Sequence, residues 1–261
     1  MAFARNDGVR IHYEVEGDGP ALVLHHGFSG SLRHWYMNGY VEALRHTYRL
    51  ILVDARGHGE SDKPHDSASY ALDTRVQDVF TILDDLGVDR TLWCGFSMGG
   101  NVVYGALAMA PQRIQATAIL AADPFPYNTT EWNTQIAWLG QGMEYYADQI
   151  EATRDPYPAE ERAQLLENDP AALIASKQET RDWPGVAVGF CSITVPTLLI
   201  GGESDPLYPL ITRAVESNPQ AAFISLPGID HINTLRRSDL TLPHVEPFLA
   251  RAEVEAASPS A

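Results

Sequence analysis

A serine lies between two glycines in the segment Gly95-Phe96-Ser97-Met98-Gly99, which has the G-x-S-x-G pattern of a nucleophile elbow. The apolar run Thr91–Cys94 before it predicts a buried strand, and the small residues of Gly99–Ala108 after it predict a helix. A sharp turn from strand to helix holds such a serine in a strained backbone conformation and exposes its hydroxyl. The pattern indicates that Ser97 is a nucleophile beside the free N–H groups of a helix N-terminus.

A serine needs an adjacent general base, itself held by a third group, before it can attack a carbonyl. Two later loops supply candidates for these roles. Asp205 follows the predicted strand Val195–Ile200. His231 follows the predicted strand Ala222–Leu226. Because open α/β sheets bind ligands at the carboxyl ends of their strands, we expect Ser97, Asp205 and His231 to meet at one sheet edge.

Alternating strand and helix patterns must position these loops. The continuous apolar runs Ala21–His26 and Tyr48–Val53 are typical of strands buried on both faces, and hence parallel. The alternating segment Gly8–Val15 predicts an antiparallel strand at the start of the chain, and Asn6-Asp7-Gly8 predicts a hairpin turn before it. Residues Asp73–Leu86 have apolar side chains on one helical face, with Gly87 as the C-cap. The sequence predicts a doubly wound, mostly parallel α/β sheet.

One region breaks this alternation, because residues 123–192 contain helical patterns interrupted by prolines and no strand-like run. We interpret residues 123–192 as a small helical cap inserted into an α/β core of residues 1–122 and 193–252. Residues 253–261 are expected to form a disordered tail. Aromatic cap residues are candidates for a mostly apolar substrate-binding wall, and the three selected are Trp132, Trp138 and Tyr146.

Composition excludes several classes of partner. The net charge is −16, from 34 acidic and 18 basic residues, which disfavours binding to nucleic acid or to an anionic membrane. No apolar run is long enough to span a membrane, and residues 1–7 lack the apolar core of a signal peptide. The two cysteines, Cys94 and Cys191, are expected to be buried, reduced thiols. We therefore expect a cytoplasmic protein, with its oligomeric state left open.

Several landmarks together make the chain resemble the serine-nucleophile branch of the α/β-hydrolase superfamily over nearly its full length. They are His26-Gly27-Phe28, the segment Asp54–Asp62 with its Asp-x-Arg-Gly-His-Gly-x-Ser pattern, the elbow, Asp205 and His231. The elbow is similar to that of bacterial carboxylesterases, cofactor-free haloperoxidases (perhydrolases) and lactonases. The resemblance implies an oxyanion hole formed by the backbone N–H groups of Phe28 and Met98, and no cofactor.

The resemblance also ranks the neighbouring polar residues. Glu203, two residues from Asp205, and Asp123, just after the predicted strand Ile114–Leu120, are alternative acids, but the family register favours Asp205. His26 is expected to orient the oxyanion loop, and Arg56 is expected to brace the Asp54–Asp62 loop. The histidines lack the spacing of metal ligands, so no metal site is predicted.

These features predict an esterase that acts on small to medium acyl chains through an acyl-enzyme intermediate, with a small-molecule ester or lactone as substrate. Lactone hydrolysis, perhydrolysis and C–C bond hydrolysis on the same triad remain alternatives. Family members that attack with aspartate, such as haloalkane dehalogenases and epoxide hydrolases, differ at the position of Ser97. A ligand-binding receptor without catalysis is the alternative from another class of protein.

Overall fold

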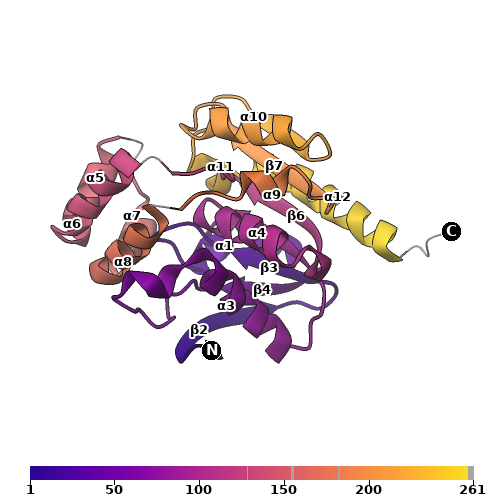
Figure 1. The fold of residues 1–261 in the computed structure, drawn as a ribbon, viewed down its shortest axis with the longest axis horizontal. Coiled ribbons are helices and arrows are strands. Elements are labelled where there is room, and N and C mark those ends of the chain that lie inside the picture. Colours follow the sequence, from indigo (N-terminus) through magenta and orange to yellow (C-terminus); the bar gives the residue numbers. More distant parts are fainter. Residues whose placement is uncertain (128, 154–155, 182, 258–261) are drawn as a thin grey trace.

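The computed structural model of the 261-residue chain describes residues 1–127, 129–153, 156–181 and 183–257. They form an eight-stranded sheet with helices on both faces (Figure 1). The strands are β1 (Ala2–Asn6), β2 (Val9–Glu16), β3 (Ala21–His25), β4 (Arg49–Val53), β5 (Thr91–Phe96), β6 (Ile114–Leu120), β7 (Thr197–Gly202) and β8 (Ala222–Leu226).

Most connections between the strands contain a helix. The α-helices are α1 (Arg33–Met37), α2 (Tyr40–Leu44), α3 (Leu72–Asp85), α4 (Met98–Met109), α5 (Thr129–Leu139), α6 (Met143–Glu151), α7 (Ala159–Leu166), α8 (Pro170–Arg181), α9 (Ala187–Phe190), α10 (Tyr208–Ser217), α11 (Asn233–Arg236) and α12 (Ser238–Ala257). Two short 3-10 helices are η1 (Ser67–Tyr70) and η2 (Pro111–Arg113).

The strand order is β1-β2-β4-β3-β5-β6-β7-β8. β2 pairs antiparallel with β1 and β4, whereas all other neighbours are parallel. His25 pairs with Gly95, and Gly95 with Ile119, so β3, β5 and β6 end at nearly the same level. The predicted doubly wound, mostly parallel sheet is confirmed, and the carboxyl ends of its central strands form one edge.

The first hairpin follows from its turn residues. Asp7 and Gly8 both have positive φ angles, 48° and 82°, as the right-handed twist of a two-residue hairpin requires. Glycine adopts this conformation without a steric penalty, and aspartate tolerates it better than most residues. The predicted turn therefore joins β1 to β2 at this position.

Alternate strand residues enter two apolar layers. Val23, Ile51 and Trp93 pack in the layer that contains α3 and α4. Leu24 and Leu52 point to the other face, where they pack in the layer that contains α2 and α12. All five side chains are fully buried, and burial of each aliphatic one contributes about 1.5–3 kcal/mol relative to exposure. A strand covered on both faces therefore reads as a continuous apolar run.

Helices α5–α8, which we call the cap helices, lie together to one side of the sheet (Figure 1, left). They have an apolar cluster of their own, made by Leu139, Met143, Tyr146, Ala147, Ile150, Leu165 and Leu173. α9 lies in the predicted cap range but packs on the core instead, because Phe190 makes an edge contact with Tyr104 of α4 at 5.0 Å between ring centroids. The described residues of 123–192 contain no strand. The division of the chain into core and cap stays a prediction.

The end of the chain departs from the expected tail. α12 continues to Ala257, so residues 253–257 are helical, and the prediction of disorder was wrong for them. Glu and Ala, which dominate this stretch, are good helix formers, and Ala252 anchors the preceding turn in the core. Residues 258–261, the rest of the predicted tail, lie outside the described part of the chain.

The two cysteines also differ from each other. Cys94 is buried in β5, as predicted, and burial raises the pKa of its thiol. Cys191 is exposed, so the prediction of a buried thiol was wrong there. The reason is the short helix α9, in which the neighbouring Phe190 takes the buried position.

No helix among the described residues has both the length and the apolar content needed to cross a membrane.

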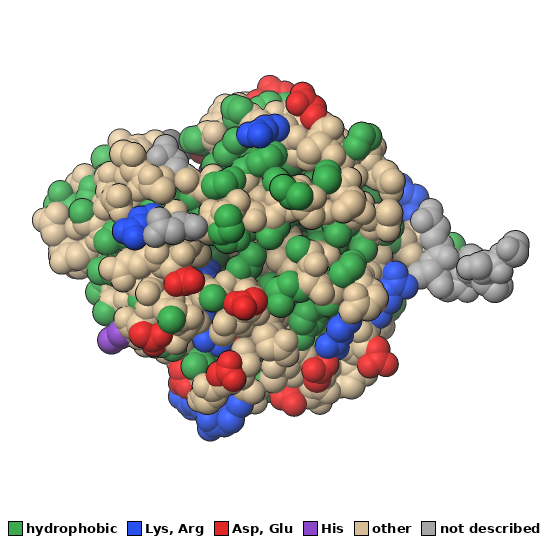
Figure 2. Space-filling view, viewed as in Figure 1, with side chains coloured by type: hydrophobic (Ala, Val, Ile, Leu, Met, Phe, Trp, Pro, Cys, Tyr) green, Lys and Arg blue, Asp and Glu red, His purple; other side chains and the backbone are tan. Residues whose placement is uncertain are grey.

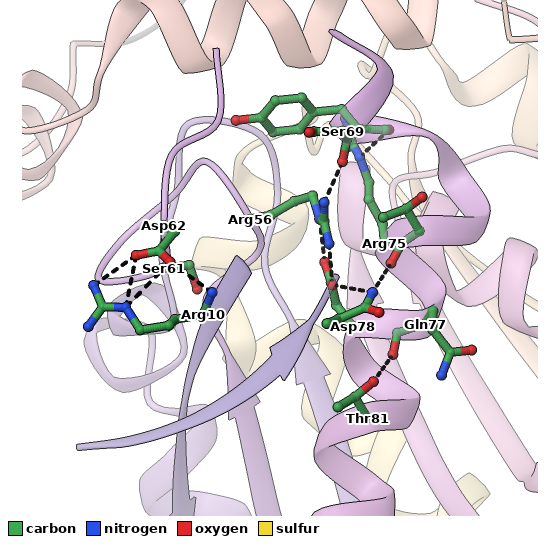
Figure 3. Close-up of polar contacts among 12 residues, drawn as sticks. Arg10, Arg56, Ser61, Asp62, Ser69, Arg75, Gln77, Asp78 and Thr81 are labelled. Atoms are coloured by element: carbon green, nitrogen blue, oxygen red, sulfur yellow. Dashed lines mark hydrogen bonds and ion pairs between the residues drawn. The ribbon is translucent and has the colours of Figure 1, made fainter. Parts of the chain in front are cut away.

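The Asp54–Asp62 loop is held by a buried ion pair (Figure 3). Arg56 donates from Nε and Nη2 to the two carboxylate oxygens of Asp78, at 2.7 and 2.6 Å, and from Nη1 to the carbonyl of Ser69. Both side chains of the pair are almost completely buried. Arg10 and Asp62 form a second pair in the same view, but this pair is exposed to solvent. The expected bracing role of Arg56 is confirmed.

We expect Arg56→Met to lower the free energy of unfolding by about 3–5 kcal/mol, because it leaves the Asp78 carboxylate buried without its partner. The matched control Arg10→Met removes the same charge from the exposed pair and should cost less than about 1 kcal/mol. Urea unfolding followed by circular dichroism measures both values. Equal losses in the two variants would contradict the assignment of Arg56 as the buried brace.

Three histidines, His25 and His26 at the end of β3 and His58 in this loop, are buried. Burial lowers the pKa of each imidazole, and it lowers that of His25 to about 3. The unfolded chain takes up protons on these residues below pH 6.5, whereas the folded protein does not. Burial also raises the pKa of Asp123 to about 6 and lowers that of Lys177 to about 7, and both of these groups work in the opposite direction.

The free energy of unfolding should therefore fall when the pH is lowered from 7 to 5. His25 alone accounts for about 2 kcal/mol of this loss, since the unfolded state gains a proton there that the folded state excludes. Urea titrations at the two pH values measure the effect. His46→Gln, at an exposed position, is the control and should keep the same slope. A stability that is constant or rises between pH 7 and 5 would be inconsistent with neutral buried histidines.

Candidate active site

Ser97 occupies a strained backbone conformation, with φ 52° and ψ −117°, at the junction of β5 and α4. A Cβ atom on Gly95 would lie 2.5 Å from the carbonyl oxygen of Gly99, and one on Gly99 would lie 2.0 Å from the carbonyl oxygen of His25. Neither position accepts a side chain without movement of the backbone. The Ser97 N–H donates to the carbonyl of Leu120 at 2.9 Å, which ties the turn to β6.

The three residues predicted to act together are joined by two hydrogen-bond contacts, both made by His231. The Oγ atom of Ser97 is 2.9 Å from Nε2 of His231. On the other side of the imidazole, Nδ1 is 2.8 Å from Oδ2 of Asp205. Asp205 is buried, and its second oxygen accepts the backbone N–H of Leu207. The loops after β5, β7 and β8 therefore bring a hydroxyl, an imidazole and a carboxylate into one line.

The two alternative acids have other partners. Glu203 is exposed and accepts a hydrogen bond from the hydroxyl of Ser225. Asp123 accepts the backbone N–H of Phe125, and burial, with a smaller contribution from the charge of Asp205, raises its pKa to about 6. Neither carboxylate is hydrogen-bonded to His231. Among the three candidates in the described structure, the geometry favours Asp205.

The predicted oxyanion residues flank the serine. Met98 is the first residue of α4, so its backbone N–H has no acceptor within the helix. Phe28 follows Gly27, on which a Cβ atom would lie 3.3 Å from the Cβ of Ser97. His26 accepts the N–H of Ala55 at Nε2, and its Nδ1 is 2.7 Å from the carbonyl oxygen of Gly27, so Nδ1 carries the proton. The expected orienting role of His26 agrees with these two contacts.

The three predicted wall residues are part of the cap. Trp132 stacks on Tyr127 at 4.4 Å between ring centroids and donates from its indole N–H to the hydroxyl of Thr180. Trp138 packs against the cap cluster, as does Phe28, whereas Tyr146 is buried inside that cluster. Their substrate-binding role stays a prediction.

A cavity of about 520 Å³ lies between α3, α4 and α8. Its lining mixes aromatic, apolar and charged residues and includes Tyr70, Arg75, Met98, Asn101, Tyr127 and Trp183. Hydrophobic side chains gather where the cap helices meet the rest of the molecule (Figure 2). Met98 connects the cavity to the elbow, whereas Ser97, His231 and the three predicted wall residues are absent from the lining. The lining is more polar than the mostly apolar wall predicted from sequence.

Sequence reasoning missed two buried cations in this region, Arg75 of α3 and Lys177 of α8. Burial lowers the pKa of Lys177 to about 7; the charge of Glu131 opposes this shift and the charge of Arg75 adds to it. Arg75 lies next to Val76 on a helix whose other buried residues are mostly apolar, and Lys177 has the exposed position 178 beside it. No pattern of spacing sets either residue apart from a surface cation.

Polar contacts also join the cap helices to the loops of the site. The side-chain amide of Asn168, just after α7, donates to the carbonyl of Ser29 at 2.9 Å. Arg236 of α11 forms an ion pair with Glu161 of α7, with Nε 3.0 Å from Oε1. The cap is thus connected to the oxyanion loop and to the helix that follows His231. In the described part of the chain, no group of three or more His, Cys, Asp or Glu side chains is arranged to hold a metal ion.

Comparisons with known proteins agree with this architecture. A family model described as alpha/beta hydrolase fold matches residues 20–172. Bifunctional epoxide hydrolase 2 of Sus scrofa is 34% identical over 122 residues, which make up 46% of this chain and 22% of that protein. 3-oxoadipate enol-lactonase 1 of Acinetobacter baylyi is 26% identical over 228 residues, 79% of this chain and 80% of that protein. Several curated relatives are matched over only 20% to 43% of their own length.

Solved structures match nearly the whole chain. A hydrolase from Pseudomonas aeruginosa superposes with a TM-score of 0.85 at 26% identity, over 95% of this chain and 97% of that chain. The enol-lactonase of Burkholderia xenovorans LB400 superposes with a TM-score of 0.86 at 23% identity, over 95% and 100% of the two chains. With the sheet order, the elbow and the family match on residues 20–172, the chain belongs to the α/β-hydrolase fold family.

Proposed function

We propose that this protein is a serine hydrolase that cleaves carboxylic esters of small to medium acyl chains. The observation that carries the proposal is the position of the His231 imidazole, within 2.9 Å of the Ser97 hydroxyl and 2.8 Å of the Asp205 carboxylate. A hydroxyl with a base on one side, and a base held in one tautomer by a buried acid, is the arrangement that acyl transfer requires.

The proposed reaction begins when Nε2 of His231 accepts the proton of Ser97 and Oγ attacks the ester carbonyl carbon. The backbone N–H groups of Phe28 and Met98 then stabilise the oxyanion, and one donor of this kind is typically worth about 2.7–4 kcal/mol. His231 gives its proton to the leaving alkoxide, and an acyl-enzyme remains. Water activated by His231 attacks the acyl-enzyme, which releases the acid and restores the Ser97 hydroxyl.

Asp205 has a separate role in this scheme. Its Oδ2 atom accepts a hydrogen bond from the protonated Nδ1 of His231, which leaves Nε2 free as the base. Its buried charge also stabilises the imidazolium formed during the reaction. The hydrogen bond from the Leu207 N–H holds the carboxylate in this orientation.

Lactone hydrolysis is the second candidate, because a relative matched over 79% of this chain is named an enol-lactonase. Perhydrolysis and C–C bond hydrolysis use the same triad and stay open. A serine rather than an aspartate at the elbow argues against epoxide opening, although several relatives are named epoxide hydrolases. A fluorophosphonate probe separates an enzyme from a ligand-binding receptor, since only a working triad is labelled rapidly. The cytoplasmic location stays a prediction.

We expect Ser97→Ala to lower kcat by about 10⁶-fold, and a further His231→Ala change to add little, because members of a triad act as a unit. Hydrolysis of a p-nitrophenyl ester measures the loss, and circular dichroism checks the fold. Ser192→Ala removes an exposed hydroxyl and is the control. Losses that multiply in the double variant would argue against a shared mechanism.

The same assay identifies the acid. Asp205→Asn should lower kcat by about 10⁴-fold, because it reverses the tautomer of the histidine. Asp123→Asn and Glu203→Gln make the same chemical change at positions that do not contact His231. If Asp123→Asn proves to be the most damaging of the three, Asp205 is not the acid.

A panel of p-nitrophenyl esters of increasing acyl length, assayed beside lactones and a hydrogen-peroxide perhydrolysis reaction, tests the substrate class. We expect kcat/KM to be highest for short or medium esters and to change gradually, because an apolar pocket discriminates by only about 1–3 kcal/mol per methylene. The active-site variant Ser97→Ala is the control in each reaction. A maximum at long acyl chains, or turnover of lactones alone, would overturn the esterase proposal.

A further inference from the structure

Two buried cations at the boundary of the cap have no counter-ion among the residues that the structure describes. Arg75 and Lys177 are 4% and 3% exposed, and neither forms an ion pair with a carboxylate of the described residues. Asp78, which lies near Arg75 in the fold, is already bound by Arg56. The charge of Glu131 acts on Lys177 without a direct ion pair. Two like charges in a buried site are costly unless an anion compensates them.

Neutral groups satisfy only part of the Arg75 guanidinium. Nε donates to the carbonyl of Tyr70 at 2.8 Å, and Nη2 donates to the hydroxyl of Ser176 at 2.8 Å. The remaining nitrogen, Nη1, has no acceptor among the described residues. Because Arg75 lines the cavity of about 520 Å³, this guanidinium is adjacent to a space that a ligand can fill.

Lys177 is adjacent to Ser176 and lies in an aromatic cage. Its Nζ atom is 3.8 Å from the ring centroid of Trp132 and 4.2 Å from that of Phe28. Aromatic faces attract a cation but do not neutralise it. Nζ has no hydrogen-bond acceptor among the described residues, so the amine keeps all three donors for a ligand.

Both cations lie close to the proposed reaction centre. Phe28, whose ring contacts Lys177, supplies one of the proposed oxyanion donors, and its neighbour Gly27 packs against Ser97. Arg75 shares its cavity with Met98, which supplies the other donor. Glu179, a carboxylate in the same cavity wall, does not pair with either cation. Ser97 and Lys177 do not line this cavity themselves, so the connection from Ser97 to the two cations runs through Phe28 and Met98.

We propose that Lys177 and Arg75 bind a carboxylate on the substrate. The hydrolase proposed above, on which this inference rests, would then prefer esters that carry a free carboxylate at the far end of a short acyl chain. The carboxylate fills the place of the missing counter-ion, with the guanidinium and the amine as charge-assisted donors. The distance between the cations and Ser97 sets the preferred chain length.

The test compares monomethyl esters of succinic, glutaric and adipic acid with the methyl esters of neutral fatty acids of the same chain length. Methanol release gives kcat/KM for each member of a pair, and the ratio of the charged to the neutral ester measures the carboxylate preference. We expect this ratio to exceed tenfold in the wild type for one chain length. It should fall at least tenfold in Lys177→Met and be largely kept in Lys177→Arg, which retains the charge.

Arg162→Gln is the matched control, because it removes a cap cation that already pairs with Asp148 and Glu151. Its ratio should equal that of the wild type. A wild-type ratio of one or less for every chain length would overturn the proposal, as would an unchanged ratio in Lys177→Met.

Calorimetry with Ser97→Ala protein separates this proposal from the proposed hydrolysis. The dianions glutarate and adipate should bind to Ser97→Ala, and at least tenfold more weakly to Ser97→Ala/Lys177→Met. If the dianions bind but the wild-type protein hydrolyses no ester, the esterase proposal is rejected and the anion site is supported. If the wild-type protein hydrolyses esters but the Ser97→Ala protein binds no dianion, the anion site is rejected and the esterase proposal is supported. If Lys177→Met does not fold, absence of dianion binding to Ser97→Ala is the result that rejects the site.

Discussion

The close approach of the first turn of α4 to the ends of β3 and β5 is the constraint on which the rest of the site depends. At Gly99 there is room for a hydrogen atom but not for a methyl group, because the carbonyl of His25 occupies that space. The same contact fixes Ser97 in a positive-φ conformation between the sheet and the helix. Everything else in the site is placed relative to this rigid corner, since β7 and β8 lie in register beside β6 and extend the same sheet edge.

Two kinds of buried charged group lie near this corner: one that has polar partners and one that has no described partner of opposite charge. Asp54 accepts hydrogen bonds from the backbone of Leu32 and Glu60 and lies 2.8 Å from Nδ1 of His12, which lowers its pKa despite its burial. It joins the loops on either side of β4 and is fully compensated. Arg75 and Lys177 are buried to a similar degree and are not compensated by any described carboxylate. This contrast favours a structural role for Asp54 and a ligand-binding role for Arg75 and Lys177.

Local patterns in the sequence predicted the parts of the molecule that depend on local physics. One local requirement explains each of these parts, and the residue type shows which one it is. The examples are the continuous apolar strands, the Asp7-Gly8 turn and the elbow glycines. The order Ser97, Asp205, His231 could be read because parallel strands end at a common edge. Two predictions were wrong for reasons that are not local. The exposure of Cys191 depends on which neighbouring side chain packs inward, and the end of α12 depends on how far the helix continues.

The cavity was harder to predict for a different reason. Tyr127, Arg75 and Gln178 come from three separate segments, and only the tertiary packing of α8 against η1 and α3 brings them together. An arginine beside Val76 and a lysine beside Gln178 have the same local sequence signature as solvent-exposed cations. Their burial depends on the placement of the cap, which no pattern of period 2 or 3.6 encodes.

The ion pair between Glu161 and Arg236 connects the cap to the segment that follows His231. α7 belongs to the cap, and α11 begins two residues after His231. A swing of the cap that separates these helices has to break this pair or to pull on the loop that carries the imidazole. The placement of α7 and the alignment of the His231 imidazole are therefore coupled through one side-chain contact.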